Sequence, residues 1–212
     1  DEEGDTEWQA TQSVTSLSLP DSLQSLLMAR MDRLSEEQQR VLQTAAVVGP
    51  VFWSGVLEAL VGHEIPNLKS KLTALQRGQF ITERGRTPDL GIEYVFKSKL
   101  IRDAAYESLL NPHRMRYHLR TAQYLEGRIA QGETSQAHSV AYGSLAHHYR
   151  CAGRPDKELF YTLKNAELAK EVYANVEASK LYSEALDLLD HVLAETVEEP
   201  ARRELKAQRL QI

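Results

Sequence analysis

The sequence predicts a mainly α-helical protein, with a winged-helix domain followed by an array of α-helical repeats. Three observations lead to this fold class. Apolar residues recur at helical spacing over roughly 20–77, two short alternating segments follow within 79–96, and helical spacing alone returns behind them. Helices followed by a two-stranded hairpin make a winged helix, and the remaining length is enough for several further helices.

Two short helices open the ordered part. Pro20 suits a first helical position, and apolar side chains then recur at helical spacing, at Leu23, Leu26, Leu27, Met31 and Leu34. The run S-E-E-Q from Ser35 to Gln38 is a capping-box pattern that predicts the start of a second helix. This helix carries a buried stripe and ends at Gly49-Pro50; the stripe is Val41, Leu42, Ala45 and Val48.

Two more helices and a hairpin complete the first part. Helices are predicted over 54–61 and 66–77, with Gly62 and Gly78 at their C-terminal ends. A strand is predicted over 79–83, a turn over 84–89 and a second strand over 91–96.

Behind the hairpin the pattern is helical throughout. Asn111-Pro112 opens one helix, while Gly132 and Gly153 separate others. We expect helices near 98–110, 112–131, 135–152, 155–174, 176–193 and 198–212.

The length of the chain favours two modest domains, and its composition indicates the class of partner and the cellular compartment. Lys and Arg number 25 against 30 Asp and Glu, and five of those acids lie in the first ten residues. The rest is therefore balanced, which disfavours nucleic acid as the main partner. Cys151 is the single cysteine, and neither a signal-peptide pattern nor a long apolar run occurs, so we expect a cytoplasmic protein without a membrane partner.

We expect three segments and a chain that is a fragment. Residues 1–18 are acidic and rich in Ser and Thr, without helical periodicity, which is typical of a disordered linker. The winged-helix domain is expected over 19–110 and the helical-repeat domain over 111–212. The latter is expected to be truncated, because the sequence stops within a helical pattern.

Two segments carry a resemblance to a known family. The run L-P-D-S-L-Q-S-L-L-M-A-R-M-D-R-L-S at 19–35 and the run Y-V-F-K-S-K-L-I-R-D-A-A-Y-E-S-L-L at 94–110 resemble the region behind the nucleotide-binding domain of signal-transduction ATPases with numerous domains, the STAND class. The sequences of these two runs are most similar to those of ATPases associated with class III adenylate or guanylate cyclases. Other members of the class are bacterial transcription activators. The segments at 145–159 and 178–186 resemble halves of tetratricopeptide helix pairs, with small residues allowing close helix approach.

The resemblance implies a regulatory, non-catalytic role. No G-x-x-x-x-G-K-[ST] loop is present in the chain, so ATP, ADP and Mg²⁺ are implied only for a nucleotide-binding domain upstream. The partners implied are that domain, for the winged helix, and a protein, for the helical repeats. The parent protein would be an ATPase and, if cyclase-associated, would control a nucleotide cyclase.

The segment that resembles the family's sensing region supplies the candidate contact residues. These are Lys97, Ser98, Lys99 and Arg102, at the predicted strand-to-helix junction. Relatives tend to read F-x-H there, with a His that approaches the nucleotide. Here Ser98 takes that place, and its hydroxyl can donate to a phosphate but cannot carry the imidazolium charge.

A DNA-binding transcription regulator is the alternative. The helix at 66–77 occupies the position of a recognition helix, and the hairpin would supply a basic wing. The candidate DNA contacts are Lys69, Ser70, Lys71, Thr73, Gln76, Arg84 and Arg86.

Neither a catalytic nor a metal site is predicted. His147, His148 and Cys151 fall on one predicted helix, and His148 and Cys151 share a face at i and i+3. His113 and His118 lie on an earlier predicted helix. No second pair of residues at metal-ligand spacing accompanies His147, His148 and Cys151, so we favour packing in a helix core as their role. No acid, base and nucleophile occur at a recognisable spacing, which disfavours an enzyme.

Overall fold

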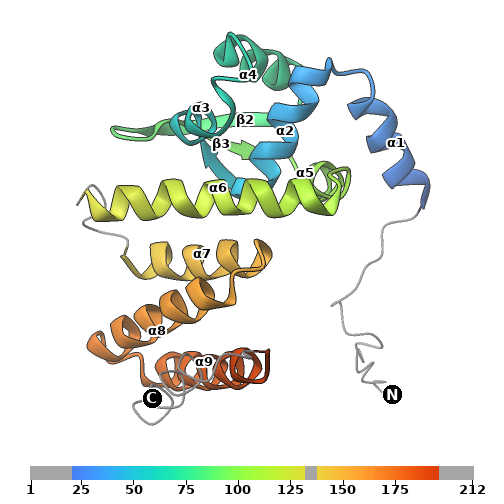
Figure 1. Ribbon diagram of the computed structural model, residues 1–212. Coiled ribbons are helices and arrows are strands. Elements are labelled where there is room, and N and C mark those ends of the chain that lie inside the picture. The colour runs from blue at the N-terminus through green and yellow to red at the C-terminus, as the bar shows by residue number, and fades with distance from the viewer. Residues whose placement is uncertain (1–20, 132–137, 196–212) are drawn as a thin grey trace, which may run out of the picture.

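The computed structural model describes residues 21–131 and 138–195 (Figure 1). Within these ranges the protein is mainly helical, with nine helices and one three-stranded antiparallel sheet. The predicted linker 1–18 and the predicted helix 198–212 lie outside the described residues.

The first two helices begin and end where the local pattern indicated. Helix α1 spans Asp21–Met31 and α2 spans Glu36–Val48. The capping box is present: the Gln38 amide donates to Ser35 Oγ at 3.3 Å, and the Ser35 amide donates to Gln38 Oε1 at 2.9 Å. Two amides that the helix leaves unpaired are thereby satisfied.

A short strand that the sequence analysis did not predict joins α2 to α3. Strand β1 spans Val51–Trp53, and α3, Ser54–Val61, follows it directly. Helix α4 spans Leu68–Arg77, two residues shorter at its start than predicted, because Asn67 adopts a left-handed conformation with φ of 55°. Gly62 and Gly78 cap α3 and α4 as predicted.

The hairpin is longer than expected. Strand β2 spans Ile81–Thr87 and β3 spans Gly91–Phe96, so the predicted turn at 84–89 is wrong over its first four residues. The polar residues continue as strand because β2 pairs with β3 as far as Thr87 opposite Gly91, after an irregularity between Glu83 and Gly85. Strand β3 lies in the middle, in the order β1-β3-β2.

Five helices follow, close to the predicted positions. They are α5, Lys99–Glu107; α6, Asn111–Ala130; α7, His138–Cys151; α8, Pro155–Glu171; and α9, Asn175–Glu195. Helices α6 to α9 pack each on the next in chain order, and Figure 1 shows them as successive layers beneath the sheet-bearing part.

Helix α6 belongs to two cores. Tyr117 lies in the large core formed by α1–α5 and the sheet, and α6 packs on both α2 and α3. One turn later Ala122 joins a second core with Leu145 and Tyr149 of α7. The sheet-bearing part is thus joined to the following helices through one shared helix.

None of the helices in the described ranges is both long and apolar enough to span a membrane.

Candidate functional site

The strand-to-helix junction places the predicted contact residues in different environments. Strand β3 ends at Phe96, and Ser98 caps α5, its Oγ accepting from the Ile101 amide at 3.3 Å. Lys97 is fixed through its backbone, which donates to the Phe80 carbonyl at 3.0 Å. The side chains of Lys97 and Lys99 are exposed on either side of the half-buried Ser98.

Arg102 differs from these lysines because it is half-buried. It lies 3.9 Å from the Asp103 carboxylate, and its Nε is buried without a hydrogen bond to any residue in the described ranges. Its positive charge contributes to lowering the pKa values of His118 and His147, although burial is the larger cause for both. Arg102 is therefore near the α6–α7 interface, and the exposed candidates are Lys97 and Lys99.

Two of the five predicted DNA contacts on α4 already have protein partners. Lys71 forms an ion pair with Glu37, and Thr73 donates to the Lys69 carbonyl within its own helix at 3.0 Å. Lys69 and Ser70 are exposed, and Gln76 is half-buried. A surface hollow of about 780 Å³ follows this helix, lined by Asn67, Lys69, Ser70, Lys71, Thr73, Ala74 and Arg77.

The two arginines of the hairpin also lie in different environments. Arg84 lies 3.5 Å from Glu93 on the neighbouring strand, which neutralises part of the predicted basic wing. Arg86 is exposed and lines a second hollow, between α3, α4 and β3, which Lys69 also lines. The basic residues that sequence analysis grouped into one DNA-binding surface therefore fall into several environments.

Histidines from two helices meet beside α5. Nδ1 of His118 on α6 is 2.8 Å from Nδ1 of His148 on α7, and Nε2 of His118 is 3.0 Å from the Tyr106 hydroxyl of α5. Both histidines are almost fully buried. Burial, followed by neighbouring positive charge, holds the pKa values of His118 and His148 well below the ordinary 6.5, so both rings are neutral at neutral pH.

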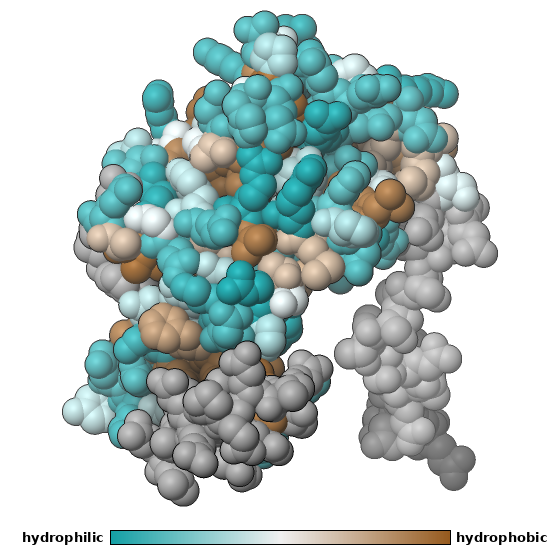
Figure 2. Space-filling model, viewed as in Figure 1, coloured by the Kyte–Doolittle hydropathy of each residue, from teal (hydrophilic) through white to brown (hydrophobic). Residues whose placement is uncertain are grey.

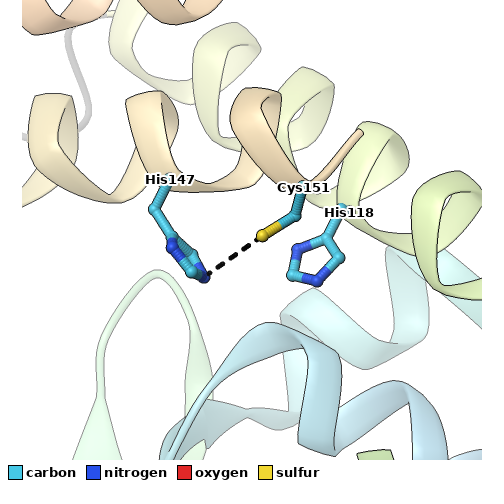
Figure 3. Close-up of side chains that lie close together, drawn as sticks. All are labelled: His118, His147 and Cys151. Atoms are coloured by element: carbon cyan, nitrogen blue, oxygen red, sulfur yellow. Dashed lines mark hydrogen bonds between the residues drawn. The ribbon is translucent and has the colours of Figure 1, made fainter. Parts of the chain in front are cut away.

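A third histidine and the cysteine complete this cluster. Figure 3 shows His147 and Cys151 projecting from α7 toward His118, with 3.8 Å between His147 Nε2 and Cys151 Sγ. One potential ligand atom from each of the three residues lies within 4.8 Å of the others. Spacing puts His148 and Cys151 on one face, but His148 turns into α6, and His147, at i, i+4, lies beside the thiol.

A carboxylate holds the next helices together. Glu126 of α6 accepts from the Tyr161 hydroxyl at 2.7 Å, from Lys157 Nζ at 2.7 Å and from the Tyr149 hydroxyl. Burial alone would raise the pKa of Glu126, but these hydrogen bonds outweigh it and hold that pKa below its usual range. The rings of Tyr149 and Tyr161 stack, with centroids 5.7 Å apart.

No match was found for this chain among protein-family models, curated proteins or solved structures.

Proposed function

We propose that this chain is a non-catalytic regulatory region of a STAND-type ATPase, made of a winged helix and tetratricopeptide-like repeats. The winged helix, α2–α4 with the β2–β3 hairpin, docks on a nucleotide-binding domain upstream. The helices behind it receive a protein signal that shifts this docking equilibrium. Control of a nucleotide cyclase is the output that the sequence resemblance favours.

The observation that carries the proposal is the exposed lysine pair at the junction of β3 and α5. Lys97 and Lys99 are exposed, while the backbone between them is held by the Phe80 carbonyl and the Ser98 cap. Two cations on a fixed backbone suit a contact with phosphates or with acidic side chains at the edge of a domain interface. The Ser98 hydroxyl accepts from an amide and keeps its proton to donate.

The helices behind the sheet supply a surface for the protein signal. At the turn between α8 and α9, Val172, Tyr173 and Val176 are 65, 87 and 88% exposed. Exposed apolar side chains gathered at one turn are typical of a protein contact rather than of a solvated surface. Over the face in view, Figure 2 shows hydrophilic residues predominating, with apolar ones scattered singly or in small groups.

The test begins with the coding sequence upstream of this chain. A G-x-x-x-x-G-K-[ST] loop is expected there. In the protein that contains it, Lys97→Glu combined with Lys99→Glu should weaken docking and speed ADP release by about three- to tenfold, the effect of two charge contacts at an interface rim. Release of a fluorescent ADP analogue measures it.

The matched control reverses two exposed lysines of the distant helices, Lys170→Glu with Lys180→Glu. It has the same charge change, so equal acceleration by both pairs would mean a general electrostatic effect and would contradict the docking surface. Absence of a nucleotide-binding domain upstream would remove the proposal's partner.

DNA binding is the second candidate, favoured by one observation. Among the described residues, those that line the hollow along α4 include Lys69, Lys71 and Arg77 but no acidic side chain. If this hollow binds duplex DNA, fluorescence anisotropy will detect salt-dependent micromolar binding that Lys69→Ala with Arg77→Ala weakens and Lys170→Ala with Lys180→Ala does not. No binding at low salt excludes it.

A further inference from the structure

We propose that His118, His147 and Cys151 form a binding site for a transition-metal ion of the Zn²⁺ class. The site lies where α5, α6 and α7 meet, and it uses one ligand from α6 and two from α7. It is independent of the role proposed for Lys97 and Lys99.

The spacing of the potential ligand atoms suits such an ion. Tetrahedral Zn²⁺ with bonds of about 2.0–2.1 Å to nitrogen and 2.3 Å to sulfur places its ligand atoms about 3.3–3.6 Å apart. The 3.8 Å between His147 Nε2 and Cys151 Sγ is already close to this value. The widest separation within the group, under 4.8 Å, closes by about 1 Å through side-chain rotation.

The surroundings of His118 indicate which of its nitrogens is the ligand. Burial is the main cause that raises the pKa of Tyr106, and the nearby Cys151 is the next. The Tyr106 hydroxyl contacts His118 Nε2. Nε2 is the nitrogen that can bind the ion once the Tyr106 hydroxyl makes way. The other nitrogen, Nδ1, is 2.8 Å from Nδ1 of His148.

This contact with His148 is the arrangement that metal-binding histidines require. A ligating imidazole donates its second N–H to a fixed acceptor, which selects the tautomer and holds the ring plane. If His118 Nδ1 carries the proton and donates to His148 Nδ1, Nε2 presents its lone pair to the ion. His148, buried at 2% exposure, is then a positioning residue rather than a ligand.

The chemistry of the donor set selects the class of ion. Two imidazoles and one thiolate are borderline-soft ligands, which favour Zn²⁺, Co²⁺ or copper over Mg²⁺ and Ca²⁺. Burial raises the pKa of the Cys151 thiol, so the ion displaces its proton: the S–H bond breaks, a metal–sulfur bond forms and one H⁺ leaves for solvent. The thiolate charge also offsets the nearby charge of Arg150. His147 is exposed, which gives the ion a path from solvent.

The test uses the untagged chain after chelator treatment, with Co²⁺ and Zn²⁺ as probes. One equivalent of Co²⁺ is expected to give a thiolate-to-metal charge-transfer band in the near ultraviolet, and Zn²⁺ should displace it. Cys151→Ser should abolish the band and His147→Gln should weaken Zn²⁺ binding at least tenfold, since even a residue behind a ligand contributes about 10–100-fold.

His113→Gln is the matched control, because His113 is an exposed histidine of α6 outside the cluster. It should leave the spectrum and the Zn²⁺ affinity unchanged. His147 is preferred to the buried His118 as the test position, since its replacement does not open the core. Zn²⁺ binding that is equal in all three variants, or Co²⁺ binding without a thiolate band, would overturn the proposal.

Discussion

Glu126 illustrates how much of the helix stacking depends on single side chains. Its carboxylate accepts from two tyrosine hydroxyls and one ammonium group, all from α7 or α8. Hydrogen bonds to a charged acceptor contribute more than neutral ones, and two of these donors belong to buried rings. One side chain of α6 therefore links three successive helices.

We predict that Glu126→Gln lowers the free energy of unfolding by about 1–3 kcal/mol, because an amide keeps only one acceptor oxygen and loses the charge. Urea unfolding at pH 7 measures the loss. Glu167→Gln is the control: Glu167 is 54% exposed and pairs with Lys164 on the surface, so the change should stay within about 0.5 kcal/mol. Equal losses would mean that the Glu126 contacts are no stronger than a surface pair.

How the stability difference between wild type and Glu126→Gln depends on pH follows from the direction of the Glu126 pKa shift. The Glu126 pKa is lower in the folded chain than its ordinary 4.5, so its carboxylate stabilises the fold above about pH 4.5. That contribution is lost as the pH falls through the folded pKa. The difference in unfolding free energy between wild type and Glu126→Gln should hence stay constant from pH 7 to about pH 4.5 and narrow as the pH falls further. A difference that does not narrow below about pH 4.5 would exclude a charge contribution.

At the scale of elements, caps decide where helices begin. Ser98 ends the extended run of β3 and starts α5 with its own hydroxyl. We predict that Ser98→Ala costs about 1 kcal/mol of unfolding free energy, while Ser98→Asp, which keeps a capping oxygen, costs much less. Chemical denaturation measures both. Ser70→Ala, on the exposed surface of α4, should be nearly neutral; a neutral Ser98→Ala would mean that the cap contributes little.

The hairpin is fixed to α3 by a close backbone approach at Gly91. This residue has φ of 82°, and a Cβ there would lie 2.5 Å from Ser54 Oγ, which accepts from the Ile92 amide. Gly91→Ala should therefore destabilise the protein by more than about 1 kcal/mol. Thermal unfolding compares it with Gly85→Ala, where a Cβ meets no atom of the described part of the chain within 4 Å. Similar losses at both glycines would contradict the close contact.

The elements that sequence reasoning placed well are those with local signals. The capping box at Ser35 and the glycines after α3 and α4 act within a few residues, so their pattern is legible. Strand β1 was missed because three residues show no periodicity, and its pairing partner, β3, lies some forty residues further along the chain. The hairpin turn was misplaced because strand pairing keeps Gly85 and Arg86 extended despite their turn-like composition.

The histidine cluster shows the same limit at a site. Spacing placed His147, His148 and Cys151 on one helix but did not show which histidine lies beside the thiol, because both i+3 and i+4 are neighbours on a helix. The packing of α7 on α6 decides between them, and it also brings in His118, thirty residues away from His148. A contact between helices leaves no local pattern in the sequence.

At the scale of the whole molecule, helices α7 to α9 pack mainly on their neighbours in chain order, and α8 also reaches Glu126 of α6. The α8–α9 core contains Leu159, Ala185, Leu189 and Leu193, none of which belongs to the sheet-bearing core. Stability in such an array is the sum of local terms and neighbour interfaces. A destabilising substitution in one part of the array should then loosen mainly the helices around it.

We predict that Leu189→Ala, at a fully buried position, costs about 2–5 kcal/mol and speeds amide hydrogen exchange in α8 and α9 while leaving α2–α4 protected. Hydrogen exchange followed by mass spectrometry resolves the two regions. Leu42→Ala, equally buried in the first core, is the reciprocal variant and should deprotect α2–α4 first. Uniform acceleration everywhere in either variant would mean that the chain opens as one unit.

The double membership of α6 constrains how genes could exchange these parts. A crossover between residues 110 and 111 would deliver the sheet-bearing part without Tyr117, leaving its core uncovered beside α2 and α3. A crossover behind Ala130 keeps that core whole. It leaves Ala122, Leu125 and Ile129 without the α7 side chains against which they pack. Recombination at either place requires a compatible helix from the donor, so the two parts are expected to be inherited together and to diverge in step along α6.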